Sequence, residues 1–423
     1  MSLTVANGGA MPVPTWFTVF KDEPDSDFGY DYNARSMLRL RDDIDLERFA
    51  RALTAALRAQ EVTRVRVEEP SPGEWVMRDS GEPFPEIRVE RLPAGSFDEV
   101  QHDIIRPFSF PGETYCRVRL ARIGDEPWVF MCRHHAFCDN FTHLICMTEA
   151  IRAYMEPGWI PPPDGYFEWA RREHEVESGP RGEEGRRFWS ERAARFADWP
   201  HSPRQDRDGS IDVTGEPNRF FFELPWSGER LAKAAAALGA SFNVIVTGAF
   251  LRAIAADHGA DRAVADWVCR GRNARTRRIG GAFVRDYDVG LVTGGDVRTF
   301  LRQVRFDLNQ GMRHPYGFAH GLVWTVDGCC GNDMAVVNIC DTNERSAVFV
   351  PDPRSLDDDC PADCADLFGL VLYIKPDGMP VPKCVVRYMP EYYSAGRVAE
   401  FIRMYLDKLA VFVREAEAEV DRA

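Results

Sequence analysis

Both halves of the chain repeat one pattern, in which short β-prone runs alternate with longer amphipathic helices. In the first half, residues 36–40 favour a strand, and Asp45 then favours the N-cap of a helix with apolar residues at helical spacing. In the second half, a helix capped by Ser241 precedes an expected strand at residues 263–269. Residues 156–215, between the halves, begin with PGWIPPPDGY and include the polar run HSPRQDRDGSID. Such a segment is typical of a connection, so the sequence predicts an α/β fold with two lobes and a cleft between them.

The expected domain organisation has three parts, an N-terminal lobe at residues 1–175, an inter-lobe connection at 176–215 and a C-terminal lobe at 216–423. The segments TRVRVEEP and GEWVMRD predict a hairpin. Further strands are expected at residues 115–122, 128–133, 218–224, 334–339, 370–375 and 384–389, and further helices at 141–155, 183–196, 228–238 and 396–417.

The net charge of the chain argues against binding to nucleic acids or to anionic membranes. Lys and Arg total 52 against 66 Asp and Glu, which gives a net charge of -14. A surface of this sign repels nucleic acids and anionic membranes, so neither is expected as a partner. No run approaches the roughly 20 apolar residues of a membrane helix, and the N-terminus lacks the pattern of a signal peptide. We therefore expect a cytoplasmic protein.

The 11 cysteines do not form a recognisable metal-binding or disulfide pattern. No C-x-x-C pair occurs, and several cysteines, such as Cys132, Cys146 and Cys340, lie inside apolar runs. This placement is typical of reduced, buried thiols in a cytosolic protein. Cys360 and Cys364 come closest to metal-ligand spacing, but a zinc site has tighter paired spacings. We therefore expect no metal.

The most conspicuous local feature is RHHAFCDN at residues 133–140, which follows an apolar strand and leads into a helix. Three interpretations are open. His134 and His135 could be buried and satisfied by hydrogen bonds. The two histidines could bind a metal with Asp139 and His143, although no recognised ligand spacing is complete. Alternatively, the corner presents one imidazole for general acid–base catalysis, because histidine exchanges protons near neutral pH.

This segment resembles the HHxxxDG core of the condensation domains of nonribosomal peptide synthesis, which share the chloramphenicol-acetyltransferase-like fold. Other segments resemble the same family in the same order. They are DIDLERFARALTAAL, RPFSFPGETYCRVRLARIGDEPWVFMCRHH, PPPDGYFEWARREHE with RRFWSERAA, SFNVIVTGAFLRAIAADHGADRAVADWVCRGRN and IGGAFVRDYDVGLV. The resemblance spans most of the chain. It implies two lobes that form a V-shaped pseudo-dimer with a tunnel between them.

The resemblance also implies roles for individual residues. His135, the second histidine of the motif after His134, would lie at the middle of the tunnel. It would take the proton from an attacking amine or alcohol, or stabilise the tetrahedral intermediate. A thioester is already activated, so the enzyme mainly aligns the nucleophile, deprotonates it and excludes water. Asp139 would be structural and pair with an arginine, for which Arg272 in the GRN segment is the candidate. A solvated loop arginine is the alternative interpretation of Arg272.

One position departs from the family motif, since Asn140 occupies the place of its glycine. Glycine lets the backbone and a ligand approach closely, whereas asparagine adds an amide beside the tunnel. We expect Asn140 to narrow the channel or to hydrogen-bond the substrate. Asn338 and Trp324 are further candidates for the tunnel wall, with ordinary core packing as the alternative.

The donor and its delivery follow from the same resemblance. No carrier-protein serine motif and no adenylation segment is found, so we expect a free-standing, monomeric enzyme with no bound cofactor. Its donor would be an acyl group on the phosphopantetheine arm of a carrier protein in trans, or a coenzyme A thioester. Carrier proteins are usually acidic, so docking needs a local basic patch. Arg275, Arg277 and Arg278 in RGRNARTRR offer one, or form a merely solvated loop.

The sequence thus predicts a free-standing condensation enzyme of natural-product biosynthesis. It would join a carrier-tethered acyl or aminoacyl thioester to an amine or an alcohol, giving an amide or an ester. Two alternatives stay open. One is an acyl-coenzyme A-dependent O- or N-acyltransferase on the same fold, and the other is a catalytically inactive recruitment domain.

Overall fold

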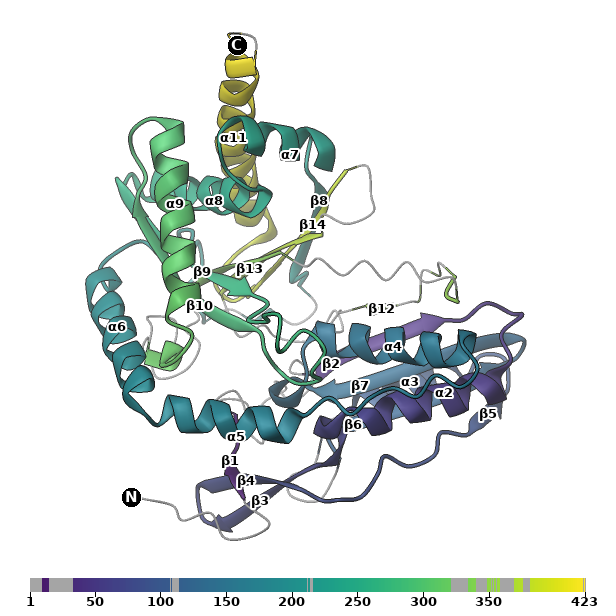
Figure 1. The fold of residues 1–423 in the computed structure, drawn as a ribbon. Helices are drawn as coiled ribbons and strands as arrows, with labels where there is room; N and C mark the ends of the chain where they lie inside the picture. The colour runs from purple at the N-terminus through teal and green to yellow at the C-terminus, as the bar shows by residue number, and fades with distance from the viewer. Residues whose placement is uncertain are drawn as a thin grey trace. The chain divides into compact units, whose positions relative to one another are not determined.

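The computed structural model describes residues 10–14, 33–106, 108, 114–210, 212–213, 216–320, 334–339, 348–350, 352, 354, 356–357, 369–375, 381–420 and 422. The chain divides into two compact units (Figure 1). Unit 1 contains Met1–Val176, Arg272–Phe283 and Glu344–Cys364, and unit 2 contains the rest. The predicted three-part division at residues 175 and 215 stays a prediction. In this structure, unit 1 also contains two segments from the second half of the chain.

Unit 1 is built on a five-stranded sheet with the order β12-β2-β7-β6-β5. The strands are β12 (Leu356–Asp357), β2 (Asn33–Arg39), β7 (Glu126–His134), β6 (Cys116–Ile123) and β5 (Val89–Leu92). Neighbouring strands are antiparallel except for β5 and β6, which are parallel. A separate three-stranded sheet has the order β1-β4-β3. It consists of β1 (Met11–Pro12), β4 (Glu74–Asp79) and β3 (Val65–Ser71), and the last two form the predicted hairpin.

Both faces of the five-stranded sheet are covered, which explains the continuous apolar run in β7. Val129 and Met131 pack in one cluster with α2 (Leu46–Ala59) and α4 (Asn140–Met155). The alternate residues of the strand pack on the opposite face against α3 (Phe97–Ile105). Packing on both faces therefore holds β7 in a fixed position. The last residue of the strand is His134.

Helix α2 confirms the helix expected after Asp45. The Asp45 carboxylate accepts a hydrogen bond from the backbone N–H of Arg48 at 3.0 Å, so Asp45 is the N-cap. Phe49, Leu53 and Leu57 follow at helical spacing, and all three are fully buried against the sheet and α4. The cap and the apolar stripe together fix where this helix begins and which face it buries.

Unit 2 contains a six-stranded sheet with the order β10-β9-β11-β13-β14-β8. Strand β11 is parallel to β9 and β13, and the other neighbours are antiparallel. The strands are β8 (Arg219–Glu223), β9 (Arg262–Cys269), β10 (Arg285–Val292), β11 (Ala335–Ile339), β13 (Leu370–Lys375) and β14 (Lys383–Tyr388). The helices are α6 (Pro180–Phe196), α7 (Gly228–Ala237), α8 (Phe242–His258), α9 (Val297–Arg313) and α11 (Ala395–Val420). Helix α5 (Tyr166–Glu177) joins unit 1 to unit 2.

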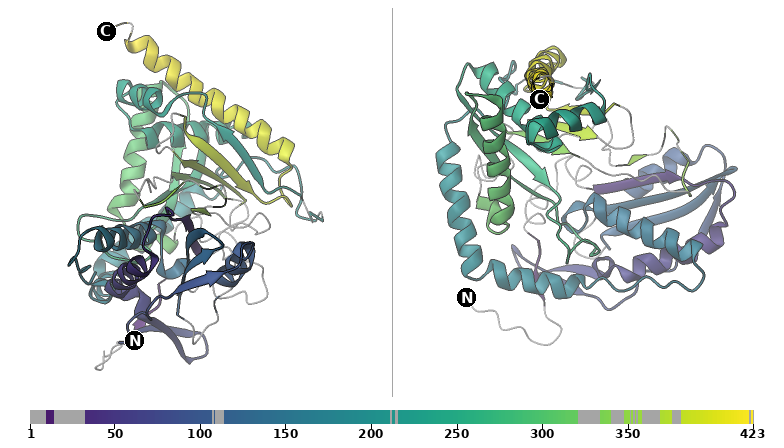
Figure 2. Two further views of the ribbon diagram at one scale, coloured as in Figure 1. Left: turned by 90° about the vertical axis from the view of Figure 1, so that its right-hand side faces the viewer. Right: turned by 45° about the horizontal axis from the view of Figure 1, so that its top comes forward.

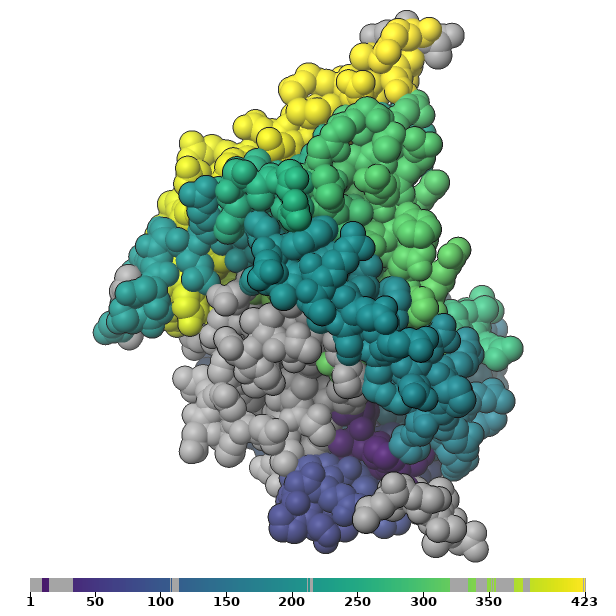
Figure 3. Space-filling model, turned by 90° about the vertical axis from the view of Figure 1, so that its left-hand side faces the viewer, coloured from purple at the N-terminus to yellow at the C-terminus, as the bar shows by residue number. Residues whose placement is uncertain are grey.

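The core of unit 2 lies between its sheet and helices α8, α9 and α11. The two views of Figure 2 show α11 as the long yellow helix that runs to the C-terminus. In the space-filling view, α9 and α11 lie side by side on the surface of unit 2 (Figure 3). Their contact includes the rings of Phe300 and Phe412, whose centroids are 6.2 Å apart.

Among the described residues, no single helix has the length and apolar character needed to cross a membrane. One pair of helices, α7 and α8, meets that test together on length and composition, and the two are bent by 86° at the break between them. Cys132 and Cys146 are buried, as predicted, whereas Cys340, Cys360 and Cys364 lie outside the described residues.

Candidate functional site

His134 is the last residue of β7 and is buried. Its ring packs against those of Tyr115 and Phe137, with centroid distances of 6.1 and 6.3 Å. Its Nδ1 accepts a hydrogen bond from the backbone N–H of Ala136 at 3.3 Å. Burial, together with the neighbouring His135, lowers the pKa of His134 to about 3. This imidazole therefore stays neutral at physiological pH and is suited to a structural role.

His135 follows directly and begins a 3-10 turn, η3 (His135–Phe137). In contrast to His134, it is partly exposed. The difference arises because successive side chains at the end of a strand point in opposite directions. The turn is closed by the backbone N–H of Cys138, which donates to the carbonyl of His135 at 3.2 Å. General acid–base chemistry needs an imidazole that a reactant can approach, and partial exposure of His135 meets that condition, whereas burial of His134 does not.

Asp139 forms the junction between this turn and α4, and it is fully buried. Its Oδ1 accepts a hydrogen bond from the backbone N–H of Thr142 at 2.9 Å, which makes Asp139 the N-cap of the helix. The hydroxyl of Thr142 lies at the same distance from this oxygen. A carboxylate also suits the positive end of the helix dipole. Local interactions thus fix where α4 begins.

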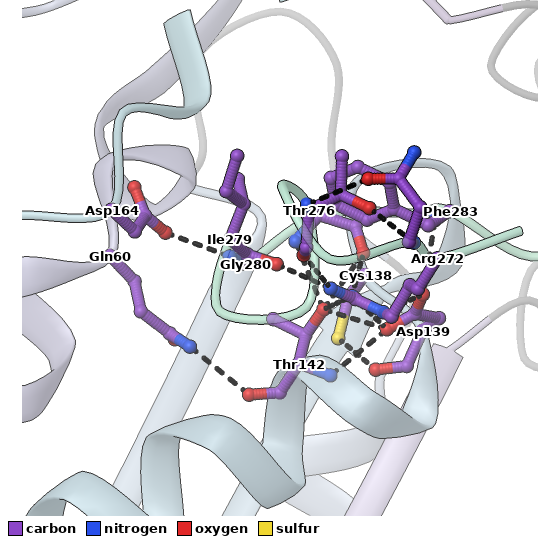
Figure 4. Close-up of polar contacts among 12 residues, drawn as sticks. Gln60, Cys138, Asp139, Thr142, Asp164, Arg272, Thr276, Ile279, Gly280 and Phe283 are labelled. Atoms are coloured by element: carbon purple, nitrogen blue, oxygen red, sulfur yellow. Dashed lines mark hydrogen bonds and ion pairs between the residues drawn. The ribbon is translucent and has the colours of Figure 1, made fainter. Parts of the chain in front are cut away.

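Arg272 holds the same carboxylate from a distant part of the sequence (Figure 4). Its Nη2 donates to Asp139 Oδ1 at 2.7 Å and its Nε to Oδ2 at 3.3 Å. Its Nη1 donates to the carbonyls of Thr276 and Ile279 at 3.0 and 2.6 Å. The backbone N–H of Phe283 donates to Asp139 Oδ2 at 3.0 Å, and the guanidinium lies 4.2 Å from the Phe283 ring centroid. The ion pair therefore anchors residues 272–283 to the histidine loop.

Thr142 and Gly281 extend this anchor, and sequence reasoning missed both. The Gly281 N–H donates to the Thr142 hydroxyl at 2.9 Å, and that hydroxyl lies 2.8 Å from the Gly281 carbonyl. Gly281 has φ +149°, and a Cβ at this position would meet the ring of Tyr166 at 2.8 Å. The available signals were a threonine three residues after Asp139, which suits a helix cap, and the Gly-Gly pair in RIGGAF.

Asp164 and Gln60 provide a second anchor for residues 272–283, again missed from the sequence. Asp164 accepts the backbone N–H of Gly280 at 2.8 Å and that of Glu61 at 3.1 Å. Burial raises the pKa of Asp164 to about 6, against the opposing effect of these hydrogen bonds. The Gln60 Nε2 donates to the Thr142 carbonyl at 3.1 Å, so Gln60 contacts the first turn of α4 while Asp164 contacts Gly280 (Figure 4).

The structure brings Asp139 and Arg272 together in unit 1 with the two histidines. Asn140 is the first residue of α4 and is partly exposed. Asn338 belongs to unit 2, where it is partly exposed on β11 and stands opposite Tyr373 of β13. Trp324 lies outside the described residues. The tunnel-lining role of Asn140, Asn338 and Trp324 stays a prediction.

The three arginines predicted for carrier docking are exposed in the segment that Arg272 anchors. Arg278 Nη2 lies 2.5 Å from Glu149 of α4, so its charge is partly compensated. Arg275 and Arg277 have no side-chain partner among the described residues, and the backbone N–H of Arg275 donates to the Asn273 side chain at 2.8 Å. Arg277 is thus an exposed cation.

Metal binding is the remaining interpretation of the histidine motif. His143 is buried, and its Nε2 lies 3.1 Å from the carbonyl oxygen of Ala34. Nε2 must therefore carry the proton and donate it, which leaves the lone pair of the ring on Nδ1. Within the described ranges, no group of three His, Cys, Asp or Glu side chains could hold a metal ion.

Comparison with known proteins gives a family match over most of the chain. A family model for the condensation domain matches residues 24–320. Tyrocidine synthase 3 of Brevibacillus parabrevis is 23% identical over 304 residues, which are 69% of this chain and 5% of that protein. The chain therefore spans only a small part of this much longer relative.

Solved structures show the same fold. The condensation domain of the Monacolin K polyketide synthase MokA superposes with a TM-score of 0.78 at 14% identity, over 96% of this chain and 98% of the other. The epimerization domain from the third module of tyrocidine synthetase B also has a TM-score of 0.78 at 14% identity, over 99% and 100%. SgcC5 from Streptomyces globisporus has a TM-score of 0.71 at 17% identity, over 96% and 99%.

These matches bear out the fold predicted from the sequence, a mixed α/β architecture with open sheets of the chloramphenicol-acetyltransferase-like type. Condensation domains are acyl-transfer enzymes that work with carrier proteins in peptide and polyketide synthesis, on substrates tethered to phosphopantetheine. With its family match over residues 24–320, the chain belongs to the condensation-domain family.

Proposed function

We propose that this protein transfers an acyl or aminoacyl group from the phosphopantetheine thioester of a carrier protein to an amine or an alcohol. The observation that carries the proposal is the contrast between the two histidines. His134 is buried and neutral, whereas His135 is partly exposed on a turn that the Asp139–Arg272 ion pair holds. Membership of the condensation-domain family supports the same reaction class.

In the proposed reaction, the amine or alcohol attacks the carbonyl carbon of the thioester. A C–N or C–O bond forms, a tetrahedral intermediate carries negative charge on oxygen, and the C–S bond then breaks. His135 accepts the proton of the nucleophile, or stabilises the intermediate, and the proton ends on the departing thiol. Because the thioester is already activated, positioning supplies much of the rate.

Asp139 and Arg272 act through His135 in this proposal, so they are positioning residues. The carboxylate caps α4 and accepts hydrogen bonds from Arg272 and from Phe283 N–H, which restricts the loop that presents the imidazole. Neither side chain is more than 6% exposed, so water competes little with the pair. Removing either partner should displace the imidazole by enough to slow the reaction without abolishing binding.

The exposed arginines of residues 272–283 support docking of an acidic carrier protein. Arg277 is the best single test, because Arg278 already pairs with Glu149 and Arg275 lines a cavity. We expect Arg277→Glu to raise KM for a carrier-borne donor and to leave kcat nearly unchanged. The matched control is Arg262→Glu, which reverses the charge of an exposed arginine in unit 2. An unchanged KM in the Arg277 variant would place docking elsewhere.

The test of the function is a gene replacement in the producing organism, with extracts compared by mass spectrometry. His135→Ala should remove one metabolite and cause its uncoupled half to accumulate, and the mass difference then identifies the joined groups. His174→Ala, which alters an exposed histidine of α5, is the control. A wild-type profile for His135→Ala, together with a changed profile for a full deletion, would contradict catalysis and favour a recruitment role.

The purified protein distinguishes between the two donors. The carrier-bound thioester and the matching coenzyme A thioester are compared at equal concentration, with kcat/KM as the measured quantity. We expect the carrier-bound donor to be preferred, since the carrier adds a protein surface to the recognition. A preference for coenzyme A would instead indicate an acyl-coenzyme A-dependent transferase.

A further inference from the structure

Helix α9 lies on the surface of unit 2 and has one buried and one exposed side (Figure 3). The buried side, which includes Phe300, Val304 and Leu308, packs in the core of the unit. On the opposite side, six residues recur at helical spacing, and at 100° per residue they fall within an arc of about 120°. These six residues, called the α9 stripe, are Arg302, Arg305, Phe306, Asn309, Met312 and Arg313.

The α9 stripe is basic, although the chain as a whole has a net charge of -14. Arg302, Arg305 and Arg313 are exposed, and none of them forms an ion pair among the described residues. Asp296, the N-cap of the helix, attracts Arg302 electrostatically. The only acidic residue within the helix is Asp307, which is buried in an ion pair with an arginine of α6. The stripe therefore presents positive charge that the described part of the chain leaves largely uncompensated.

Two large apolar side chains are exposed beside these arginines. Phe306 is 61% exposed and Met312 is 52% exposed. At 1.5 Å per residue the two positions lie about 9 Å apart along the helix axis. Aromatic residues, Met and Arg are enriched in protein–protein interfaces, whereas Lys, Asp and Glu are depleted there and are absent from the stripe. The composition of the stripe therefore indicates a surface that contacts protein.

The length and the charge of the stripe indicate which kind of protein surface fits it. From Arg302 to Arg313 the stripe extends about 17 Å along the axis, which is about three turns of a helix. A second helix packed alongside could place carboxylates against the arginines and apolar side chains against the exposed ring and thioether. Nucleic acids and anionic membranes are also negative, but a chain with a net charge of -14 repels such extended polyanions.

We propose that the α9 stripe binds an acidic amphipathic helix of a partner protein. The carboxylates of that helix pair with the three arginines, and its apolar side chains contact Phe306 and Met312. The stripe belongs to unit 2, whereas Arg277, proposed for carrier docking, belongs to unit 1. The partner is therefore distinct from the carrier protein, and its binding does not depend on the proposed acyl transfer.

The test measures binding of a synthetic helical peptide to the full chain by fluorescence anisotropy. The peptide has about 18 residues, long enough for an isolated helix, and carries Glu and Leu on one face. We expect saturable binding that weakens as salt is raised. Arg302→Glu combined with Arg305→Glu should weaken binding at least about tenfold. The control, Arg171→Glu combined with Arg172→Glu, reverses two exposed arginines of α5 and should leave the affinity unchanged.

Two further measurements distinguish a docked helix from general attraction between opposite charges. Phe306→Ala, which alters no charge, should weaken binding about fivefold or more, because apolar contact area is lost. Ile160→Ala, which truncates an exposed apolar residue of unit 1, is its control. The bound peptide should also slow the oxidation of Met312 by peroxide and leave that of Met155, 60% exposed on α4, unchanged.

Four results would overturn the proposal. They are the absence of saturable binding, equal affinity of wild type and the double arginine variant, unchanged affinity of Phe306→Ala, and unchanged oxidation of Met312. Displacement of the peptide by phosphatidylserine vesicles or by single-stranded DNA would also contradict it, by assigning the stripe to a membrane or to a nucleic acid. A raised KM for a carrier-borne donor in the double variant would make the carrier the occupant. The binding assays need no activity, so they stand apart from any failure of the proposed function.

Discussion

The guanidinium of Arg272 donates hydrogen bonds to both carboxylate oxygens of Asp139, although 133 residues separate the two in the sequence. Asp139 is also the N-cap of α4, so one carboxylate joins a local helix start to a distant segment. The two functions reinforce each other, because each restricts the same side chain. The C-terminal end of the turn that carries His135 is therefore fixed by a local and a long-range interaction at once.

Loss of this ion pair should lower stability and activity together. We expect Arg272→Ala to reduce the free energy of unfolding by about 3–5 kcal/mol, since it leaves a buried carboxylate without its cation. Urea denaturation measures the change. Arg262→Ala, which removes an exposed pair with Asp261, should leave the unfolding curve unchanged. Equal curves for both variants would show that the Asp139–Arg272 pair adds no stability.

Gly281 should not tolerate a side chain. With φ +149° and Tyr166 within 2.8 Å of the position of a Cβ, alanine there requires both backbone strain and displacement of a buried ring. We expect Gly281→Ala to cost about 2–4 kcal/mol of stability, measured by urea denaturation. Gly294→Ala is the matched control, because no atom lies within 4 Å of its Cβ position. A Gly281 variant as stable as the control would contradict this account of the close contact.

His134 should make the folded state sensitive to acid. Its folded pKa of about 3 lies below the ordinary value of 6.5, so the unfolded chain binds one more proton between these values. Its contribution to stability is complete above about pH 6.5 and is lost as the pH falls towards 3, at up to about 1.4 kcal/mol per pH unit. Unfolding free energies measured at pH 7 and pH 5 should therefore differ less in His134→Gln than in wild type. Equal differences would show that His134 titrates normally.

Asn140→Gly should alter substrate preference rather than stability. The residue begins α4 and is partly exposed, so its amide is available to a bound molecule. We expect the glycine variant to accept bulkier acyl or acceptor groups, with the ratio of kcat/KM values for a large and a small substrate shifted by about tenfold or less. Unchanged ratios and unchanged kcat would remove Asn140 from the substrate channel.

The elements with strong local signals could be predicted from the sequence. Helix α4 begins within one residue of its predicted start and ends at the predicted residue, because Asp139 caps it. Strand β10 was not predicted, since Asp286 and Asp288 argue against a buried strand, yet both are 1% exposed. Helix α5 was predicted as part of a linker, because the proline-rich segment before it conceals its helical character. Tertiary packing determines the structure of both β10 and α5, and local sequence patterns contain no information about such packing.

Some residues of the candidate site could likewise be predicted from the sequence, and others could not. RHHAFCDN could be singled out because two histidines and an aspartate follow a strand directly, and the resemblance to the condensation family then indicated Arg272. The contributions of Gln60, Asp164 and Gly281 could not be predicted, since each acts through a hydrogen bond between a side chain and a backbone group that are far apart in the sequence. Such bonds depend on the position of the chain and leave little trace in residue type.

Residues 272–283 belong to unit 1 but are made after more than 90 residues of unit 2. During synthesis, Asp139 leaves the ribosome 133 residues before Arg272, an interval of about 7–27 s at 5–20 residues per second. For that time the nascent N-terminal half has a buried carboxylate position without its cation. We therefore expect co-translational folding of unit 1 to pause in a near-native intermediate. The anchor of the histidine loop would form only when the chain emerges beyond residue 283, so a truncated product that ends at residue 215 would retain the histidine motif but lack its anchor.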